Sequence, residues 1–192
     1  MKRLYRTLTD YIIVKGMAEE SDREMYEYAF EVAMELGIFV LACIIITLCL
    51  GMFWEGVFFF IIFIPLRSYA GGLHMETYTS CFCMSCLAFS GVLLGSKYIE
   101  VPGCYSGLLV LLLEIMVYKL YPVEHVNRSV DEAENVYFKK KLIGFLLLDC
   151  GIVVVCLILE EGGFLLTAAA TFLLIVFTMI AGKWKNKNLG NV

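Results

Sequence analysis

Long apolar runs separated by short polar segments dominate the chain after residue 35. The first run without a charged residue, 36–54, contains 19 residues, close to the roughly 20 that a helix needs to cross about 30 Å of hydrocarbon. Five further apolar runs follow, at 56–66, 82–98, 104–121, 142–159 and 163–182. The second of these is short, and we expect its helix to begin near Phe53. The pattern therefore predicts an all-α polytopic integral membrane protein with about six transmembrane helices.

Basic residues are confined almost entirely to one side of this arrangement. With six spans, the segments on that side are 1–35, 67–81, 119–141 and 183–192, and they hold 14 of the 15 Lys and Arg residues. Cytoplasmic segments carry an excess of Lys and Arg, so both termini are predicted to be cytoplasmic. The expected organisation is a six-helix membrane domain (36–182) with cytoplasmic loops at 67–81 and 122–141, and a basic tail at 183–192.

The first 35 residues predict amphipathic cytoplasmic helices rather than another span. In 21–36, apolar residues recur at i, i+3, i+4, i+7, i+8 and i+11, and a similar stripe covers 4–12 between basic side chains. This composition suits a helix lying on anionic lipid headgroups, and equally a helix packed on the bundle. The residues leave both readings open.

Composition agrees with a membrane protein and excludes a soluble globular one. Hydrophobic residues make up 60% of the chain and charged residues 18%, with a mean hydropathy of +0.81, whereas a soluble domain is about 45–50% apolar. Aromatic residues, at 14%, argue against disorder. Most of the 8 cysteines lie in apolar stretches, where free thiols behave as small buried hydrophobes.

The loop 67–81 contains the densest set of reactive groups. Cys81 is expected at the start of the third span, where the helix dipole favours an anion, which suits a nucleophile. His74 is the candidate general base. Seven residues of straight helix would separate them by about 10 Å, whereas a dyad needs about 3 Å. The chain must therefore bend, and Gly71 and Gly72 supply the backbone freedom.

Other readings of this loop remain open from the residues alone. A loop histidine and a cysteine at a helix start are more often incidental than catalytic. Zinc ligation by His74, Cys81, Cys83 and Cys86 is the rival chemistry. The C-x-C-x-x-C spacing falls in an apolar helix start and lacks paired CxxC hooks, so no metal is expected. Thr77, Thr79 and Ser80 are the residues expected to begin the helix just ahead of Cys81.

Two motifs resemble those of a known family. Arg67, Gly72, His74 and Cys81 form R-x4-G-x-H-x6-C after an apolar span, and Pro122 followed by Asn127-Arg128 resembles a P-x4-N-[KR] loop. Together with the six-span layout, these motifs resemble the AgrB family, membrane cysteine endopeptidases of the accessory gene regulator system. The resemblance covers nearly the whole chain and implies a multi-pass protein of the bacterial cytoplasmic membrane with its active site at the cytoplasmic face.

The resemblance also implies a reaction. Cys81, activated by His74, would cleave an AgrD-like pro-peptide near its C-terminal side through a thioester. The peptide would then be cyclised to a thiolactone or lactone for quorum sensing. Substrate binding or oxyanion support is assigned to a further set of residues: Arg67, Gly71, Gly72, Pro122 and Asn127. No cofactor and no nucleic-acid partner is expected. The lipid bilayer is an expected partner, and the choice between monomer and homodimer stays open.

The residues leave two assignments open: the partner that orients His74, and the role of two acidic residues inside the spans. The residue that orients His74 is open between Glu76, Glu31 and Asn127, and His125 reads as a loop residue. Glu114 and Asp149 lie inside predicted spans, where ionisable groups are costly and often mark pathways. They support an alternative function as a small transporter or permease component, and a non-catalytic membrane scaffold is a third reading.

Overall fold

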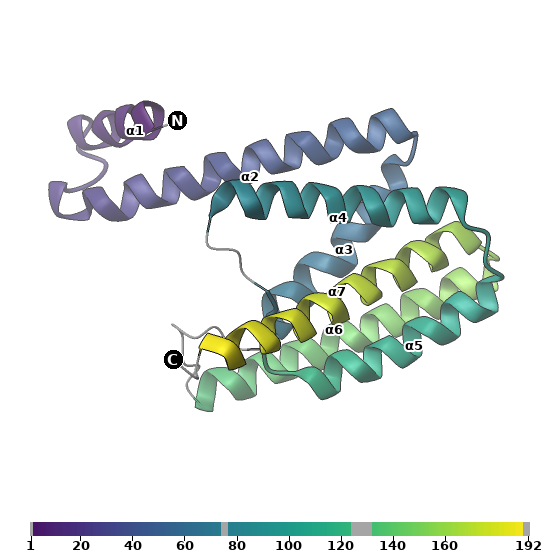
Figure 1. Cartoon of the computed structure of the whole chain (residues 1–192). Coiled ribbons are helices and arrows are strands. Elements are labelled where there is room, and N and C mark those ends of the chain that lie inside the picture. Colours follow the sequence, from purple (N-terminus) through teal and green to yellow (C-terminus); the bar gives the residue numbers. More distant parts are fainter. Residues whose placement is uncertain (1, 74–76, 124–131, 190–192) are drawn as a thin grey trace. The chain divides into compact units, whose positions relative to one another are not determined.

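The computed structural model describes residues 2–73, 77–123 and 132–189, which form helices and no strand. The helices are α1 (Lys2–Val14), α2 (Arg23–Leu50), α3 (Phe53–Ala70), α4 (Tyr78–Tyr98), α5 (Gly103–Leu120), α6 (Glu132–Ile158) and α7 (Gly162–Leu189) (Figure 1). Of these, α2 to α7 are long and apolar enough to cross a membrane. The all-α, six-span prediction is therefore confirmed.

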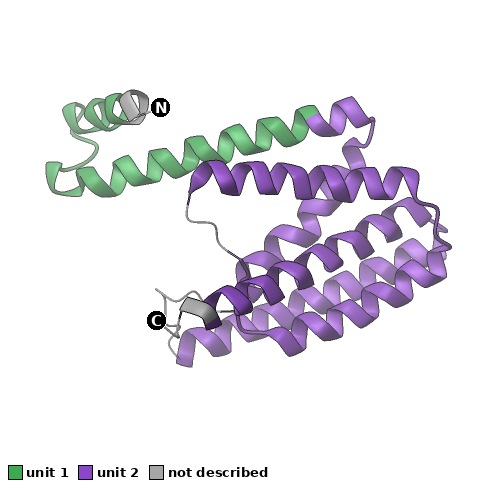
Figure 2. Ribbon diagram, in the orientation of Figure 1, with its two compact units in different colours: residues 1–45 green, residues 46–192 purple. Residues whose placement is uncertain are grey.

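The chain divides into two compact units, Met1–Ile45 and Ile46–Val192 (Figure 2). The smaller unit contains α1 and most of α2. Arg23 stabilises the turn between α1 and α2, because the Arg23 guanidinium donates to Asp10 at 2.6 Å and also to Glu20. The amphipathic segment expected at 21–36 and the first span form one continuous helix, α2, rather than two separate helices.

The first span ends earlier than its apolar run. We expected it to reach Trp54, but α2 ends at Leu50. Gly51 has φ 68°, and the Met52 N–H donates to the Thr47 carbonyl at 2.9 Å, which is the Schellman arrangement of helix ends. Glycine adopts this left-handed conformation without steric cost, so it stops the helix inside an apolar stretch.

In the larger unit, α7 lies at the centre and packs against α3, α4, α5 and α6. Half of its span, 50%, is buried, compared with 28% or less for each of the other spans. The core comes from α3, α5, α6 and α7, with Leu66, Val117, Leu142 and Phe172 fully buried. A cluster of phenylalanines, Phe59, Phe60, Phe63 and Phe89, joins α3 to α4.

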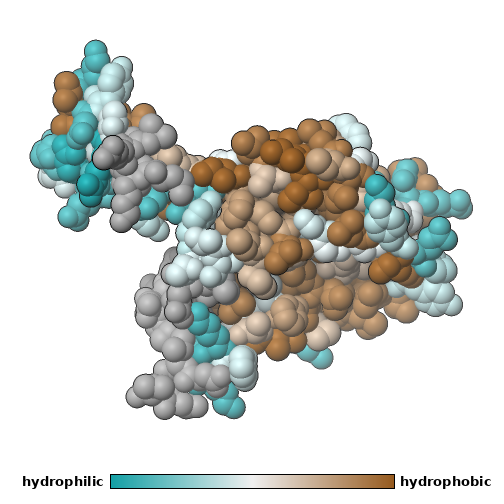
Figure 3. Space-filling view, turned by 45° about the horizontal axis from the view of Figure 1, so that its top comes forward, coloured by the Kyte–Doolittle hydropathy of each residue, from teal (hydrophilic) through white to brown (hydrophobic). Residues whose placement is uncertain are grey.

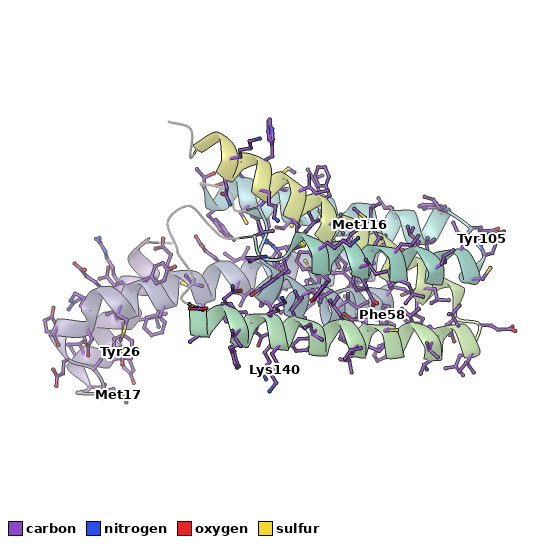
Figure 4. All side chains as sticks on the ribbon, turned by 90° about the horizontal axis from the view of Figure 1, so that it is seen from below. Met17, Tyr26, Phe58, Tyr105, Met116 and Lys140 are labelled. Carbon is purple, nitrogen blue, oxygen red and sulfur yellow. The ribbon has the colours of Figure 1, made fainter. Side chains whose placement is uncertain are left out.

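The surface of the larger unit follows the membrane pattern. Apolar side chains cover its flank, and hydrophilic residues gather at its two ends (Figure 3). Lys140 projects away from the helices, whereas Phe58 points inward and packs on the core (Figure 4). An apolar flank between polar ends matches the solvent that a lipid bilayer provides.

Candidate functional site

Arg67 connects the last turn of α3 to the loop that follows. Its Nη2 atom donates a hydrogen bond to the main-chain carbonyl of Leu73, six residues later. Within the part of the chain that the structure describes, its Nη1 atom is buried without a hydrogen-bond partner. The side chain therefore folds back over the loop and keeps one buried donor unused.

The two glycines of this loop adopt conformations that other residues rarely reach. Gly71 has φ 79° and Gly72 has φ 143°, both in the region that favours glycine. A Cβ atom at Gly71 would overlap the main-chain oxygen of Val123, and one at Gly72 would overlap Nη1 of Arg67. Glycine is thus required at both positions for the backbone angle and for the space.

The second predicted loop meets the first at this point. The Val123 N–H donates to the Ala70 carbonyl at 3.2 Å, and Gly71 and Val123 form an isolated parallel bridge. The peptide bond between Tyr121 and Pro122, just before Val123, is cis. The motif residue Pro122 is thereby placed beside the loop that contains Gly71, whereas Asn127 and His125 lie outside the described residues.

The last span completes the support of the loop. The Leu73 N–H donates to the Thr178 carbonyl of α7 at 2.9 Å. A Cβ atom on Gly182, one turn further along α7, would lie 2.8 Å from the Gly72 carbonyl carbon and 2.9 Å from the Leu73 nitrogen. The chain entering His74 is therefore held by α3, by the second loop and by α7.

Cys81 lies in the first turn of α4 and is exposed. Thr77 is the N-cap: its hydroxyl accepts from the Ser80 N–H at 3.4 Å and donates to the Ser80 hydroxyl at 2.9 Å. The Cys81 N–H bonds to the Thr77 carbonyl at 3.1 Å. This confirms the prediction that the helix begins just ahead of Cys81, where the dipole favours an anion.

Arg67 also relates the two ends of the loop electrostatically. Its guanidinium lies within Coulomb range of Cys81. The predicted base His74 and the candidate orienter Glu76 lie outside the described residues, so their roles stay predictions. The third candidate orienter, Glu31, lies on α2 in the smaller unit.

The rival zinc set is not assembled by the described residues. Cys81 and Cys83 are exposed and Cys86 is half-buried. Among residues 2–73, 77–123 and 132–189, no three His, Cys, Asp or Glu side chains come together as a metal site. His74, the fourth member of that set, is not among these residues.

Glu114 on α5 and Asp149 on α6 form a separate polar pair. Glu114 is 9% exposed and Asp149 3%, and the two carboxyl groups interact electrostatically. In the described part of the chain, Glu114 Oε1 and Asp149 Oδ2 have no hydrogen-bond partner. Glu114 also lines a pocket of about 350 Å³ between α5 and α6, together with Tyr118 and Cys150.

Sequence reasoning missed the residues that hold the loop from outside it. Leu73, Val123, Thr178 and Gly182 act through main-chain groups or through the absence of a side chain, and neither leaves a chemical motif. One signal was present: Ala181-Gly182 is a pair of small residues near the end of a span, a pattern that permits close backbone approach in membrane proteins.

Comparison with known proteins identifies a family. The model of a family described as AgrB, Accessory gene regulator B, matches residues 5–183. No curated protein and no solved structure matches the chain.

Proposed function

Because the chain belongs to the AgrB family, whose model matches nearly its whole length, we propose that it is a membrane-embedded cysteine endopeptidase that cleaves and cyclises an AgrD-type pro-peptide. The proposal assigns Cys81 as the nucleophile and His74 as the general base. It places the reaction at the cytoplasmic face of the bacterial cell membrane, where the basic loops are expected.

The position of Arg67 is the observation that carries this proposal. Its guanidinium bonds to the Leu73 carbonyl, directly before His74, and lies within Coulomb range of Cys81. The Arg67 side chain is thus near both ends of the loop that contains His74 and Cys81, the two residues of the assigned dyad. Reactive cysteines are commonly found in the first turn of a helix and near a cationic side chain.

The proposed reaction begins with acyl transfer to the enzyme. His74 takes the proton from the Cys81 thiol, and Sγ attacks the carbonyl carbon of the scissile bond. The C–N bond then breaks, the leaving amine of the C-terminal tail receives the proton from His74, and the peptide remains as a thioester on Cys81. We assign two kinds of group to stabilise the oxyanion: the Nη1 donor of Arg67, which has no hydrogen-bond partner among the described residues, and main-chain N–H groups near Gly71 and Gly72.

Cyclisation completes the cycle without ATP. A thiol or hydroxyl of the same peptide attacks the thioester carbonyl and loses its proton to His74. The C–S bond to Cys81 breaks, and Sγ recovers the proton, so a thiolactone or lactone leaves the enzyme. Exclusion of water at the membrane surface would favour this ring closure over hydrolysis.

Residues 1–35 are assigned the docking of the pro-peptide at the inner membrane face. In the smaller unit, apolar side chains such as Tyr11, Val14, Met25 and Tyr28 are exposed. An amphipathic segment of this kind binds an apolar surface with its apolar face and anionic lipid headgroups with its basic side chains.

Co-expression with an AgrD-type pro-peptide tests the proposal. The mass of the peptide and of any enzyme adduct is followed for the wild type, Cys81→Ala, Cys81→Ser and His74→Ala. Each of these variants is expected to lose cleavage while remaining in the membrane. Cys83→Ala is the matched control, because Cys83 is also exposed on α4 and has no assigned role. Undiminished cleavage by Cys81→Ala would overturn the proposal.

A further inference from the structure

Thr178 and Gly182 lie one helical turn apart on α7, at the place where the loop from α3 touches that helix. In an α-helix, the side chain at position i+4 lies over the turn that contains the carbonyl of residue i. Gly182 has no side chain, which leaves the Thr178 carbonyl open to a neighbouring main chain. The Leu73 N–H occupies it at 2.9 Å.

The space beside Gly182 is filled by main-chain atoms rather than by flexible side-chain ends. A Cβ atom there would lie 2.8 Å from the Gly72 carbonyl carbon, 2.9 Å from the Leu73 nitrogen and 3.0 Å from Cγ1 of Val123. A side chain at 182 would therefore push the loop off α7 and break the Leu73 hydrogen bond. Close backbone contact of this kind is what small residues provide between membrane helices.

We propose that Thr178 and Gly182 are positioning residues: together they form a platform on the last span that fixes the Gly72–Leu73 segment, from which the chain continues to His74. The inference rests on the proposed function, since it concerns the base assigned there. The platform acts through Leu73, whose carbonyl is held at the same time by Arg67. Two hydrogen bonds therefore fix the main chain of the residue directly before the assigned base: its N–H donates to the Thr178 carbonyl, and its carbonyl accepts from the Arg67 side chain.

The test compares Gly182→Ala with Gly151→Ala. Gly151 is in the interior of α6 and has open space around its Cα atom, so it controls for the general effect of alanine in a membrane helix. Alanine is a better helix former than glycine, and a loss caused by Gly182→Ala therefore runs against helix propensity. Displacing the loop is expected to lower kcat for the pro-peptide by about 10- to 100-fold with a smaller change in KM.

A second readout needs no substrate. The rate of Cys81 alkylation by iodoacetamide is followed against pH, between about pH 6 and pH 8, where histidine titrates, by mass spectrometry of the peptide that contains Cys81. A base close to the thiol makes it reactive at lower pH than in His74→Ala. Gly182→Ala is expected to shift toward the His74→Ala profile, and Gly151→Ala is expected to keep the wild-type profile. A Gly182→Ala enzyme with wild-type kcat and profile would overturn the proposal.

A cross-link decides the case if Gly182→Ala fails to accumulate. The Leu73 nitrogen and the Thr178 carbonyl oxygen are 2.9 Å apart, which brings the two Cα atoms within the range that a disulfide requires, and Thr178 Oγ1 points toward the adjacent residue, Gly72. In Leu73→Cys/Thr178→Cys, mild oxidation is expected to form a disulfide, and the oxidised protein is expected to keep the wild-type profile. Absence of the disulfide, or a His74→Ala profile in the oxidised protein, would overturn the platform.

The two proposals fail separately. If the wild type does not process the pro-peptide but its alkylation profile still depends on His74 and Gly182, the platform stands and the peptidase assignment falls. If the wild type and His74→Ala share one alkylation profile, the dyad is contradicted. The cross-link between positions 73 and 178 is then the test of whether the platform exists.

Discussion

Two adjacent glycines determine how the chain leaves α3 and reaches the assigned base. Each has a positive φ, and each faces an atom that leaves no room for a Cβ atom. At Gly72 that atom is Nη1 of Arg67, at the end of a long side chain that can turn aside only by giving up its hydrogen bond to the Leu73 carbonyl. At Gly71 it is the main-chain oxygen of Val123, which moves only if the junction between the two loops opens.

Gly71→Ala is therefore expected to damage the site more than Gly72→Ala does. The strained backbone alone costs about 1–3 kcal/mol, and at Gly71 the loss of the contact with the Val123 main chain is added to it. The expected result is loss of pro-peptide processing, with the protein still inserted. Processing is measured by peptide mass spectrometry and membrane content by immunoblot.

Gly144→Ala is the control, because it adds a methyl group in open space on α6. Equal activity of Gly71→Ala and Gly144→Ala would show that the junction of Gly71 with Val123 is not needed for the site.

At the residue scale, the sequence predicted features that depend on side-chain type and missed contacts made by main-chain groups. Cys81 was placed at a helix start from its neighbours Thr77 and Ser80, and the structure has it there. A bend after Gly71 and Gly72 was also expected. Thr178 could not be found in this way, because it contributes a main-chain carbonyl that every residue type possesses.

At the scale of elements, α5 and α6 place two carboxyl groups inside the bundle. Glu114 and Asp149 are buried and interact with each other, and in the described part of the chain neither forms an ion pair with a basic side chain. Charged groups are costly in hydrocarbon, and two carboxylates close together also repel each other, so neutral amides are expected to be tolerated at both positions. The transporter alternative requires these carboxyl groups, whereas the peptidase proposal does not.

Glu114→Gln and Asp149→Asn are therefore expected to process the pro-peptide at the wild-type rate. Their thermal midpoint in detergent is expected to stay equal or rise by a few degrees, because a gain of about 1 kcal/mol shifts Tm by about 2–4 °C in a chain of this size. Processing is followed by mass and Tm by differential scanning fluorimetry. Loss of processing in either variant, with Tm unchanged, would return attention to a function of this pair.

Helix ends were the part of the elements that the sequence predicted least well. The second apolar run was placed at 56–66, and Pro65 lies just before its end. The helix α3 nevertheless continues through Pro65 to Ala70, because Leu66 and Ala70 in its last turn are fully buried in the core. Conversely, α2 ends at Leu50 inside an apolar run, because Gly51 adopts the left-handed conformation. Hydropathy predicts spans, but packing and single glycines set their limits.

At the scale of the whole molecule, the alternation of six spans and the distribution of charge predict which ends face the cytoplasm. Cys81, in the first turn of α4, and the basic run before residue 142 belong to the predicted inner side. Lys97, the single basic residue of the outer side, donates a hydrogen bond to the Leu50 carbonyl at 2.6 Å. Lys97 thus satisfies a carbonyl at the end of α2. This local role explains why a basic residue lies on the outer side.

Native cysteines at the two ends of the larger unit provide the test of this topology. Cys104 is exposed in the first turn of α5, at the predicted outer end, and Cys81 is exposed at the predicted inner end. A membrane-impermeant maleimide added to intact cells is expected to label Cys104 and to leave Cys81 unmodified until the membrane is opened, with Cys104→Ser identifying the outer adduct. Because 14 of the 15 Lys and Arg residues lie on the side of Cys81, the positive-inside rule leaves one orientation for six spans. Labelling of Cys81 in intact cells would reverse that orientation and would place cleavage outside the cell, where a pro-peptide made in the cytoplasm must already have crossed the membrane.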